Sequence, residues 1–195
     1  KYVTGAMVEG EIAAKTMVEE LDMAAGDCAD SCVSTEDARE RTDSGFADKV
    51  AEYNAILGRS EGMYSTEQLE DAMQKVMDTY AGGIGSHYQF NEKQLELAKE
   101  KIEHIRKLAD GVSAEDYHEL MFAYELKERL TVCLSLIAHL AARKETRWHS
   151  FDENLDYPEK SDEWLKYVNS KKVDGHIQII ERKLVGRGEI YEHSN

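Results

Sequence analysis

The sequence has few positive charges for its size. It holds 24 Lys and Arg against 39 Asp and Glu among 195 residues, which gives a formal net charge of −15. Such an excess of acid opposes binding to phosphate backbones and to anionic lipid, so we expect no nucleic-acid partner. The acidic residues are spread along the chain, which favours a solvated acidic surface and leaves a basic protein partner as the alternative.

Cysteine, proline and long apolar runs are also scarce. Three cysteines, of which only Cys28 and Cys32 are close in sequence, make no disulfide framework and favour a cytoplasmic setting. The longest strongly apolar run, residues 130–142, is too short to cross a bilayer, so we expect no membrane span. The start at Lys1 has no signal-peptide pattern, and we expect it to be the cut end of a longer protein.

What the sequence does contain is apolar residues at helical spacing, separated by capping residues and glycines. The predicted helices cover residues 4–23, 34–57, 65–81, 91–110 and 113–143, and the second could instead begin nearer Ser44. The longest has two apolar faces, so we expect the other helices to cover it. After Lys172 the alternating stretch HIQIIERKLV predicts a short strand or hairpin. The predicted fold is mainly α, an antiparallel helical bundle like a spectrin repeat with a short C-terminal β-hairpin or strand.

Several residue patterns have some features of a catalytic or metal site, and none has all of them. Glu115 and His118 have the spacing of one half of a di-metal site in a bundle, but a second such pair is missing. Cys28 and Cys32 have no second cysteine pair and are interpreted as loop thiols. His139 lies six residues from Cys133, off its helical stripe, and is interpreted as a core histidine. The glycines of AGGIGSH, residues 81–87, predict a helix stop.

The most distinctive stretch begins where the longest helix ends and reads ARKETRWHSFDENLDYPEKSDEWLKYVNSK. It resembles the C-terminal region of the flavoprotein subunits of fumarate reductase, succinate dehydrogenase and adenylylsulfate reductase. The residues that follow the family's order are Arg143, Glu145, Thr146, Arg147, Asp156, Pro158, Asp162 and Trp164. Trp148 and the tail WLKYVNSK look closer to adenylylsulfate reductase alpha subunits. LEDAMQKVMDTYAGG is similar to another helix of the family.

The start of the chain, KYVTGAMVEGEIAAK, is similar to the last helix of the family's FAD-binding domain. The resemblance implies that Tyr2, Thr4, Gly5 and Ala6 contact FAD, and unpaired amides at a helix N-terminus favour the negative charge of a reduced flavin. The alternative is an ordinary capped helix. The family's catalytic residues and glycine fingerprint would precede Lys1, so the resemblance implies no catalytic residue here and no retention of FAD by this fragment alone.

The resemblance also implies a domain organisation and a function. Residues 1–34 would be the terminal helix and linker of a preceding FAD-binding domain, 35–172 the helical bundle, and 173–195 a β element with a tail. The bundle would support the FAD domain and subunit assembly in an electron-transferring, FAD-dependent oxidoreductase. Its partners would be the preceding FAD-binding and capping domains, and could include an iron–sulfur subunit.

The same stretch supplies the predicted interface with those partners, because large aromatics and arginine suit contact surfaces. The predicted interface residues are Arg143, Arg147, Trp148, His149 and Trp164. Alternatively, the aromatics could cap the bundle's own core, Trp164 above all. The alternative function is a stand-alone helical interaction or scaffold domain without redox activity.

Overall fold

The computed structural model describes residues 35–185, and their side chains from Gly45 onward. The predicted helix over residues 4–23 lies outside this range, as do Cys28 and Cys32. The chain divides into two units, Lys1–Ala51 and Glu52–Asn195. Of the first unit, the structure describes part of helix α2 (Thr35–Leu57), which therefore begins at Thr35 and not near Ser44. The last turn of α2 belongs to the second unit, which carries the rest of the described fold.

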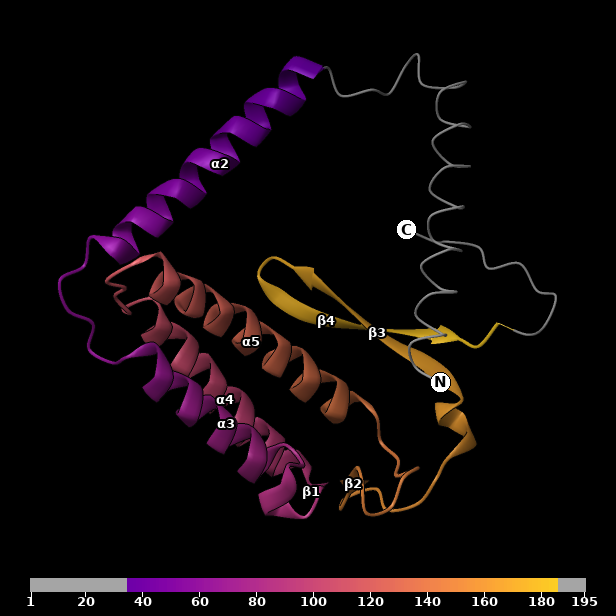
Figure 1. Cartoon of the computed structure of the whole chain (residues 1–195). Helices are drawn as coiled ribbons and strands as arrows, with labels where there is room; N and C mark the ends of the chain where they lie inside the picture. The colour runs from indigo at the N-terminus through magenta and orange to yellow at the C-terminus, as the bar shows by residue number, and fades with distance from the viewer. Residues whose placement is uncertain (1–34, 186–195) are drawn as a thin grey trace, which may run out of the picture. The chain divides into compact units, whose positions relative to one another are not determined.

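Helices α3 (Thr66–Tyr80), α4 (Glu92–Ala109) and α5 (Tyr117–Ala142) lie side by side and alternate in direction (Figure 1). The caps expected for α3 and α4 are confirmed. Ser65 and Gln68 form a capping box, in which each side chain accepts from the other's backbone amide. Asn91 Oδ1 accepts from the Gln94 amide at 2.9 Å. Both helices therefore begin where local side-chain chemistry can satisfy their first amides.

Helix α5 begins later than the sequence predicts. Its N-cap is Asp116, whose Oδ1 accepts from the Glu119 amide at 2.9 Å, so the expected start at Ser113 is wrong by one turn. The Glu119 carboxylate in turn accepts from the Glu115 amide at 2.8 Å. A carboxylate at the N-cap and another in the first turn complement the helix dipole, which favours this start.

The glycines after α3 end the helix, as expected. Gly82 adopts φ +76°, a conformation that favours glycine. Gly83 lies so close to Asp78 that an added Cβ would meet the Asp78 Cα at 2.4 Å. The Asp78 carboxylate accepts from the Gly85 amide at 2.9 Å, at the start of a short 3-10 helix, Ile84–Ser86. This close packing turns the chain back toward α4.

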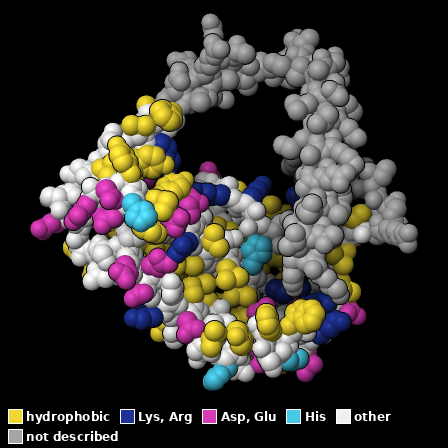
Figure 2. All heavy atoms as spheres, in the orientation of Figure 1, with side chains coloured by type: hydrophobic (Ala, Val, Ile, Leu, Met, Phe, Trp, Pro, Cys, Tyr) yellow, Lys and Arg dark blue, Asp and Glu magenta, His cyan; other side chains and the backbone are white. Residues whose placement is uncertain are grey.

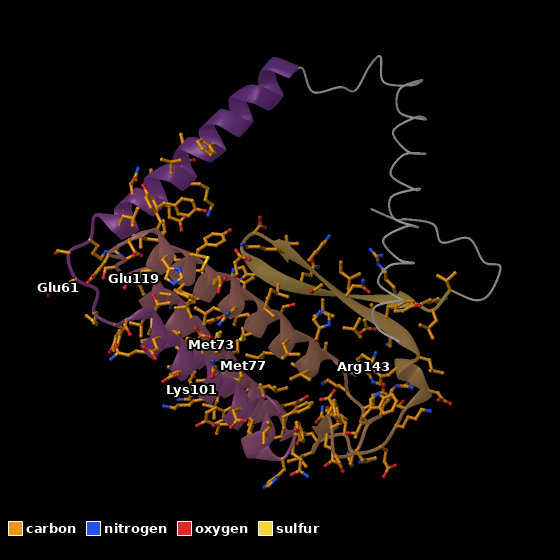
Figure 3. The ribbon with its side chains drawn as sticks, viewed as in Figure 1. Glu61, Met73, Met77, Lys101, Glu119 and Arg143 are labelled. Atoms are coloured by element: carbon orange, nitrogen blue, oxygen red, sulfur yellow. The ribbon has the colours of Figure 1, made fainter. Side chains whose placement is uncertain are left out.

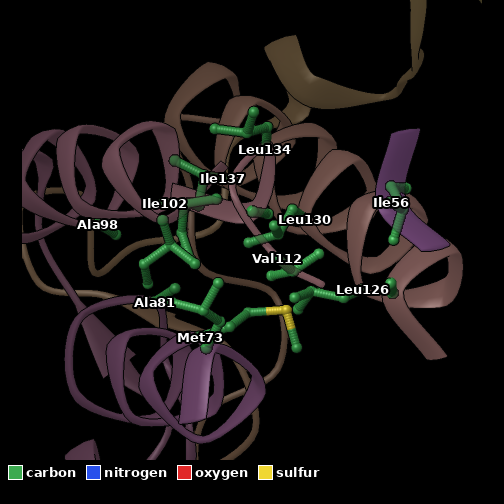
Figure 4. Packing of buried hydrophobic residues seen from close by; sticks show 14 of the residues in the cluster. Ile56, Met73, Ala81, Ala98, Ile102, Val112, Leu126, Leu130, Leu134 and Ile137 are labelled. Atoms are coloured by element: carbon green, nitrogen blue, oxygen red, sulfur yellow. The ribbon is translucent and has the colours of Figure 1, made fainter. Parts of the chain in front are cut away.

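The core lies between α3, α4 and α5 and is entirely apolar in its centre (Figure 4). Each helix contributes residues three or four apart, which places them on one face. The buried apolar residues are Ile56, Leu69, Met73, Ala81, Phe90, Leu95, Ala98, Ile102, Ile105, Ala109, Val112, Ala114, Leu120, Ala123, Leu126, Leu130, Leu134 and Ile137. One continuous cluster therefore joins the last turn of α2 to the other three helices.

Only one face of α5 is covered by helices. Val132 is 65% exposed and Leu136 is 47% exposed, although both lie in the apolar run of this helix. The prediction that neighbouring helices cover both apolar faces of α5 is therefore wrong for the described residues. Figure 2 shows apolar side chains, in yellow, at the surface of the body among charged ones.

A C-terminal hairpin lies along α5. Strands β3 (Lys166–Val173) and β4 (His176–Lys183) pair antiparallel around Asp174 and Gly175, which both have positive φ. Two positive φ values suit the tight turns that match strand twist. The predicted fold class, a mainly helical bundle with a C-terminal hairpin, is confirmed, although the first strand begins at Lys166 and not after Lys172. None of the described helices is long and apolar enough to span a bilayer.

Two further short strands connect distant parts of the chain. Strand β1 (Gln89–Phe90), between α3 and α4, pairs in parallel with β2 (Glu153–Asn154), which follows α5. The Glu153 amide donates to the Tyr88 carbonyl at 2.9 Å, and the Leu155 amide donates to the Phe90 carbonyl at 2.8 Å. This pairing fixes the distinctive segment after α5 against one end of the bundle.

Substitution at two sites of α5 should distinguish its buried face from its exposed one. Leu130 is fully buried, so Leu130→Ala is expected to lower the free energy of unfolding by about 3 kcal/mol, through lost burial and a residual cavity. Val132→Ala removes two methyl groups from an exposed position on the same helix and should change stability by less than about 0.5 kcal/mol. Urea unfolding of the 195-residue chain measures both. Equal effects would contradict the described packing of α5.

Candidate functional site

The segment after α5 is organised around a carboxylate that water does not reach. Arg143 is the C-cap of α5 and has an extended backbone. Glu145 lies two residues from Arg143 and two from Arg147, and both arginines contact Glu145 Oε1 at 2.5 Å. The Glu145 side chain is 0% exposed. Figure 3 shows Arg143 where α5 ends.

The second oxygen of the same carboxylate is also satisfied. Glu145 Oε2 accepts from the Ser161 amide at 3.0 Å, and Arg147 Nη2 donates to the Ser161 carbonyl at 3.1 Å. Burial by itself raises the pKa of Glu145, but the hydrogen bonds from Arg147, the Ser161 amide and Arg143 outweigh it and hold the pKa below its ordinary value. Glu145 is therefore ionised at neutral pH and joins two points of the segment, residues 143–147 and Ser161.

Thr146, on the opposite side of the extended chain, forms a second buried centre. Its hydroxyl donates to the Tyr157 carbonyl at 2.9 Å and accepts from the Asn154 amide at 3.0 Å. Its own amide donates to the Glu159 carbonyl at 3.2 Å. Asn154, also buried, donates through its side chain to the Arg143 carbonyl at 3.4 Å. Residues 153–161 are thereby held against residues 143–147, the stretch that carries Glu145.

Arg143 also connects this segment to the hairpin. Its guanidinium donates to the carbonyls of Trp164 and Lys166, each at 3.3 Å. It lies 5.9 Å from the centre of the Trp164 ring, and Lys166 Nζ lies 4.4 Å from the same centre. Trp164 is half-buried and accepts two cations on its ring, an arrangement that stabilises their charge. Within the described residues, Trp164 therefore packs on the domain itself, at the start of β3.

Two aromatic side chains in the loop that follows Arg147 are exposed. Trp148 is 72% exposed and Phe151 is 75% exposed. The Phe151 ring stacks on Tyr88, with the ring centres 5.8 Å apart. His149 Nδ1 lies 3.4 Å from the Glu153 carboxylate, and that carboxylate also accepts from Gln89 Nε2 at 2.9 Å. The loop thus has a fixed backbone and an outward-facing aromatic surface.

The predicted interface residues fall into two groups in the structure. Arg143, Arg147 and Trp164 lie together around Glu145 and the start of the hairpin, and their contact with another domain stays a prediction. Trp148 and His149 lie on the exposed loop. Their contact with another domain stays a prediction. The residues assigned to FAD by resemblance, Tyr2, Thr4, Gly5 and Ala6, lie outside the described residues.

Residue patterns did not predict three partners of this site. Ser161 contributes through its backbone, Tyr88 through its carbonyl and a stacked ring, and Asn154 through its amide and its side chain. A polar side chain such as Asn154 within an acidic stretch has no signature of burial. The spacing of Arg143, Glu145 and Arg147 was the available signal, since it puts a basic residue two positions before and two positions after one carboxylate.

The other candidate residues show no catalytic arrangement in the described part of the chain. Burial raises the pKa of the Cys133 thiol, which keeps it protonated and unreactive. His139 Nε2 lies 3.0 Å from the Ser170 hydroxyl on β3, so His139 joins α5 to the hairpin and is not a core residue. Within residues 35–185, no three His, Cys, Asp or Glu side chains are grouped so as to hold a metal ion.

The described residues do not fit FAD either. Strand β1 leads into α4 and has a parallel partner, as in a dinucleotide-binding unit. The connection between them is Asn91, whose side chain caps the helix, and it contains no glycine turn through which a backbone could approach a pyrophosphate. Flavin binding by this part of the chain is therefore not supported by its geometry.

Comparison with known proteins identifies the relatives of this fold. A curated relative, the adenylylsulfate reductase alpha subunit of Megalodesulfovibrio gigas, is 31% identical over 98 residues, which are 50% of this chain and 15% of that subunit. The solved adenylylsulfate reductase of Archaeoglobus fulgidus is 34% identical with a TM-score of 0.60, covering 66% of this chain and 20% of that one. An E. coli quinol fumarate reductase structure shares the fold, with a TM-score of 0.65 at 19% identity, covering 83% of this chain and 27% of that one.

The helical body and its appended hairpin are thus a C-terminal domain of the kind found in flavoprotein oxidoreductase subunits. Residues 70–187, more than half of the chain, match the family described as fumarate reductase flavoprotein C-term, and the chain belongs to that family. It spans less than a third of the length of these relatives.

Replacing the central carboxylate should destabilise the domain in a pH-dependent way. Glu145→Gln leaves two guanidiniums without their counter-charge, and we expect a loss of roughly 2 kcal/mol at pH 7, reduced from the usual cost of a broken buried pair because both arginines are partly exposed. The folded pKa is lowered, so the contribution of Glu145 is complete above the ordinary glutamate pKa of about 4.3. It is lost as the pH falls through the lowered value.

Urea unfolding of the 195-residue chain between pH 7 and pH 3 measures this difference. Glu163→Gln, at an exposed carboxylate of the same segment, is the matched control and should change little. A difference between wild type and Glu145→Gln that stayed constant across this range would contradict an ionised, paired Glu145.

The Thr146 hydroxyl can be tested by a substitution of almost the same shape. Thr146→Val removes the hydroxyl that donates to Tyr157 and accepts from Asn154, and we expect a loss of about 2 kcal/mol because buried polar groups are left unpaired. Thr131→Val, at an exposed hydroxyl on α5 that bonds only to the Lys127 carbonyl, serves as control. Thermal unfolding of both variants compares them, and equal stabilities would show that Thr146 does not organise the segment.

Proposed function

We propose that this domain supports the FAD-binding part of a flavoprotein subunit and takes part in assembling the subunit for electron transfer. Family membership and the identity to adenylylsulfate reductase alpha subunits support a redox parent enzyme. In that enzyme the flavin supplies the redox chemistry. The work of this domain is then structural: it offers a fixed surface to the preceding domains and to a partner such as an iron–sulfur subunit.

The observation that carries this proposal is the exposed aromatic loop on a rigidly held segment. Trp148 and Phe151 are large apolar side chains left mostly in water, while the backbone around them is fixed by the β1–β2 pair and by Glu145. Exposed aromatics on a preorganised backbone are typical of contact surfaces, because little conformational entropy is lost when they are covered.

The uncovered side of α5 supports the same proposal. Val132 and Leu136 are exposed on a helix whose other face forms the core. Leu165 and Tyr167, which follow Trp164 at the start of the hairpin, are also exposed. Apolar surface of this extent suggests that further protein covers the domain in the whole subunit. We assign the predicted interface residues Trp148 and His149 to that contact, with Arg143, Arg147 and Trp164 holding the loop in place.

Truncation of the aromatic loop in the whole flavoprotein subunit tests the proposal. Trp148→Ala combined with Phe151→Ala should weaken the docking of this domain by about 2 kcal/mol or more, as for buried aromatic anchors. FAD should then be released at a lower temperature, and less subunit should be recovered in the assembled enzyme. Flavin fluorescence during heating and size-exclusion chromatography measure the two effects.

Two controls separate docking from folding. Tyr117→Ala removes an 81% exposed aromatic at the other end of α5 and should leave FAD release unchanged. The unfolding of the 195-residue chain itself should change little in the same double variant, because both rings are mostly exposed and lie outside its core. Normal FAD retention and assembly in the double variant would refute the aromatic loop as the docking surface.

A further inference from the structure

A groove lies between α4, α5 and the tip of β3 and β4. Its volume is about 620 Å³, within the range of ligand-binding clefts. Its apolar lining comes from all three elements: Leu95, Leu134, Ile137, Ala138, Ala141 and Ile177. Two of these are alanines on α5, whose small side chains leave space where larger residues would fill it.

The groove is long. On α4 it extends from Glu92 to Arg106, and on α5 from Thr131 to Ala141. At 1.5 Å per residue these walls are about 21 Å and about 15 Å long. A compact small molecule would contact only part of such a groove, whereas a peptide segment would contact all of it.

The hairpin wall of the groove is basic, which is unusual in a chain with a formal net charge of −15. It carries Lys171, Lys172 and His176. Neither lysine forms an ion pair with any residue that the structure describes. Cations that no described residue neutralises, beside an apolar floor, favour a ligand that presents carboxylates to them.

The α4 wall is close to neutral by comparison. Glu96 and Glu103 line it together with Lys99 and Arg106, each acid three residues before a base. A third acid on this wall, Glu92, is paired with Lys144 at 3.1 Å. The charge that a ligand meets therefore differs between the walls: mixed on α4 and positive on the hairpin.

We propose that this groove binds an amphipathic, acidic peptide segment of a partner protein. The apolar side chains of the segment lie on the floor formed by α5 and Ile177, and its carboxylates face Lys172, which pairs with Ile177 across the hairpin; Lys171 lies on the neighbouring position of the same edge. This mode combines burial of an apolar face in a groove with charge complementarity along one edge. It involves neither Trp148 nor Phe151, so it is independent of the proposed docking of the FAD domain.

A binding measurement with a defined peptide tests the proposal. The probe is a fluorescein-labelled 12-residue peptide of Leu and Glu, arranged so that a helix would carry leucine on one face; its counterpart has Lys in place of Glu. Fluorescence anisotropy with the 195-residue chain at low salt should show binding of the acidic peptide and not of the basic one. Affinity for the acidic peptide should fall as salt is added.

Variants of the groove locate the binding. Lys171→Glu with Lys172→Glu should weaken binding about tenfold or more, which corresponds to about 1.4 kcal/mol. The charge-matched control is Lys75→Glu with Lys160→Glu, at exposed positions outside the groove, and it should bind nearly as well as wild type. Ala141→Trp, which fills the groove from an exposed position, should also weaken binding while the melting temperature stays unchanged.

Three outcomes would overturn the proposal. One is no binding of the acidic peptide at low salt. Another is an equal loss of affinity in the two charge-reversal pairs, which would indicate a response to net charge alone. The third is binding of dodecanoate, a small anionic amphiphile, by a groove that does not bind the acidic peptide.

Discussion

A single buried carboxylate, Glu145, determines how the chain leaves the helical body. Once removed from water, a carboxylate is stable only if charged or hydrogen-bonded partners surround it. Arg143, Arg147 and the Ser161 amide meet that requirement together, and the Ser161 amide is available only if the segment folds back on itself. The conformation of residues 143–161 is thus a consequence of satisfying one charged group, with Thr146 satisfying the neutral groups on the other side of the chain.

This arrangement links local chemistry to the role that we propose for the domain. The segment is held to the bundle through β1 and β2 and to the hairpin through Arg143, so the aromatic loop between these attachments has a defined position. The fold leaves apolar surface on two sides: the loop that carries Trp148, and the uncovered face of α5. A domain with a complete core and additional exposed apolar surface is suited to contact other domains. The relatives have much longer chains, which contain further protein beyond the part that matches this domain.

The sequence predicted features that depend on near neighbours. The caps at Ser65 and Asn91 are set by side chains three residues away, and the glycines after α3 act on the adjoining turn, so local patterns were sufficient. The start of the hairpin at Lys166 was missed because KYVNSKKV has little apolar alternation, and β4 supplies its pairing.

Long-range features could not be inferred in the same way. The exposure of Val132 depends on which elements pack beside α5, and a helical wheel carries no such information. The pairing of Arg143 and Arg147 with acids of the segment could be predicted from their spacing. The contributions of Tyr88, Asn154 and Ser161 come from chain reversals that the residue pattern does not encode.

Amide hydrogen exchange of the 195-residue chain tests the central role of Glu145 most directly. In Glu145→Gln, the amides of Thr146, Asn154 and Ser161 should exchange much faster than in wild type, because the bonds that protect them depend on the folded-back segment. The amides around Leu126 and Leu130 in the core of α5 should keep their protection. Unchanged exchange at Thr146, Asn154 and Ser161 would show that the segment is held without Glu145 and would contradict the account.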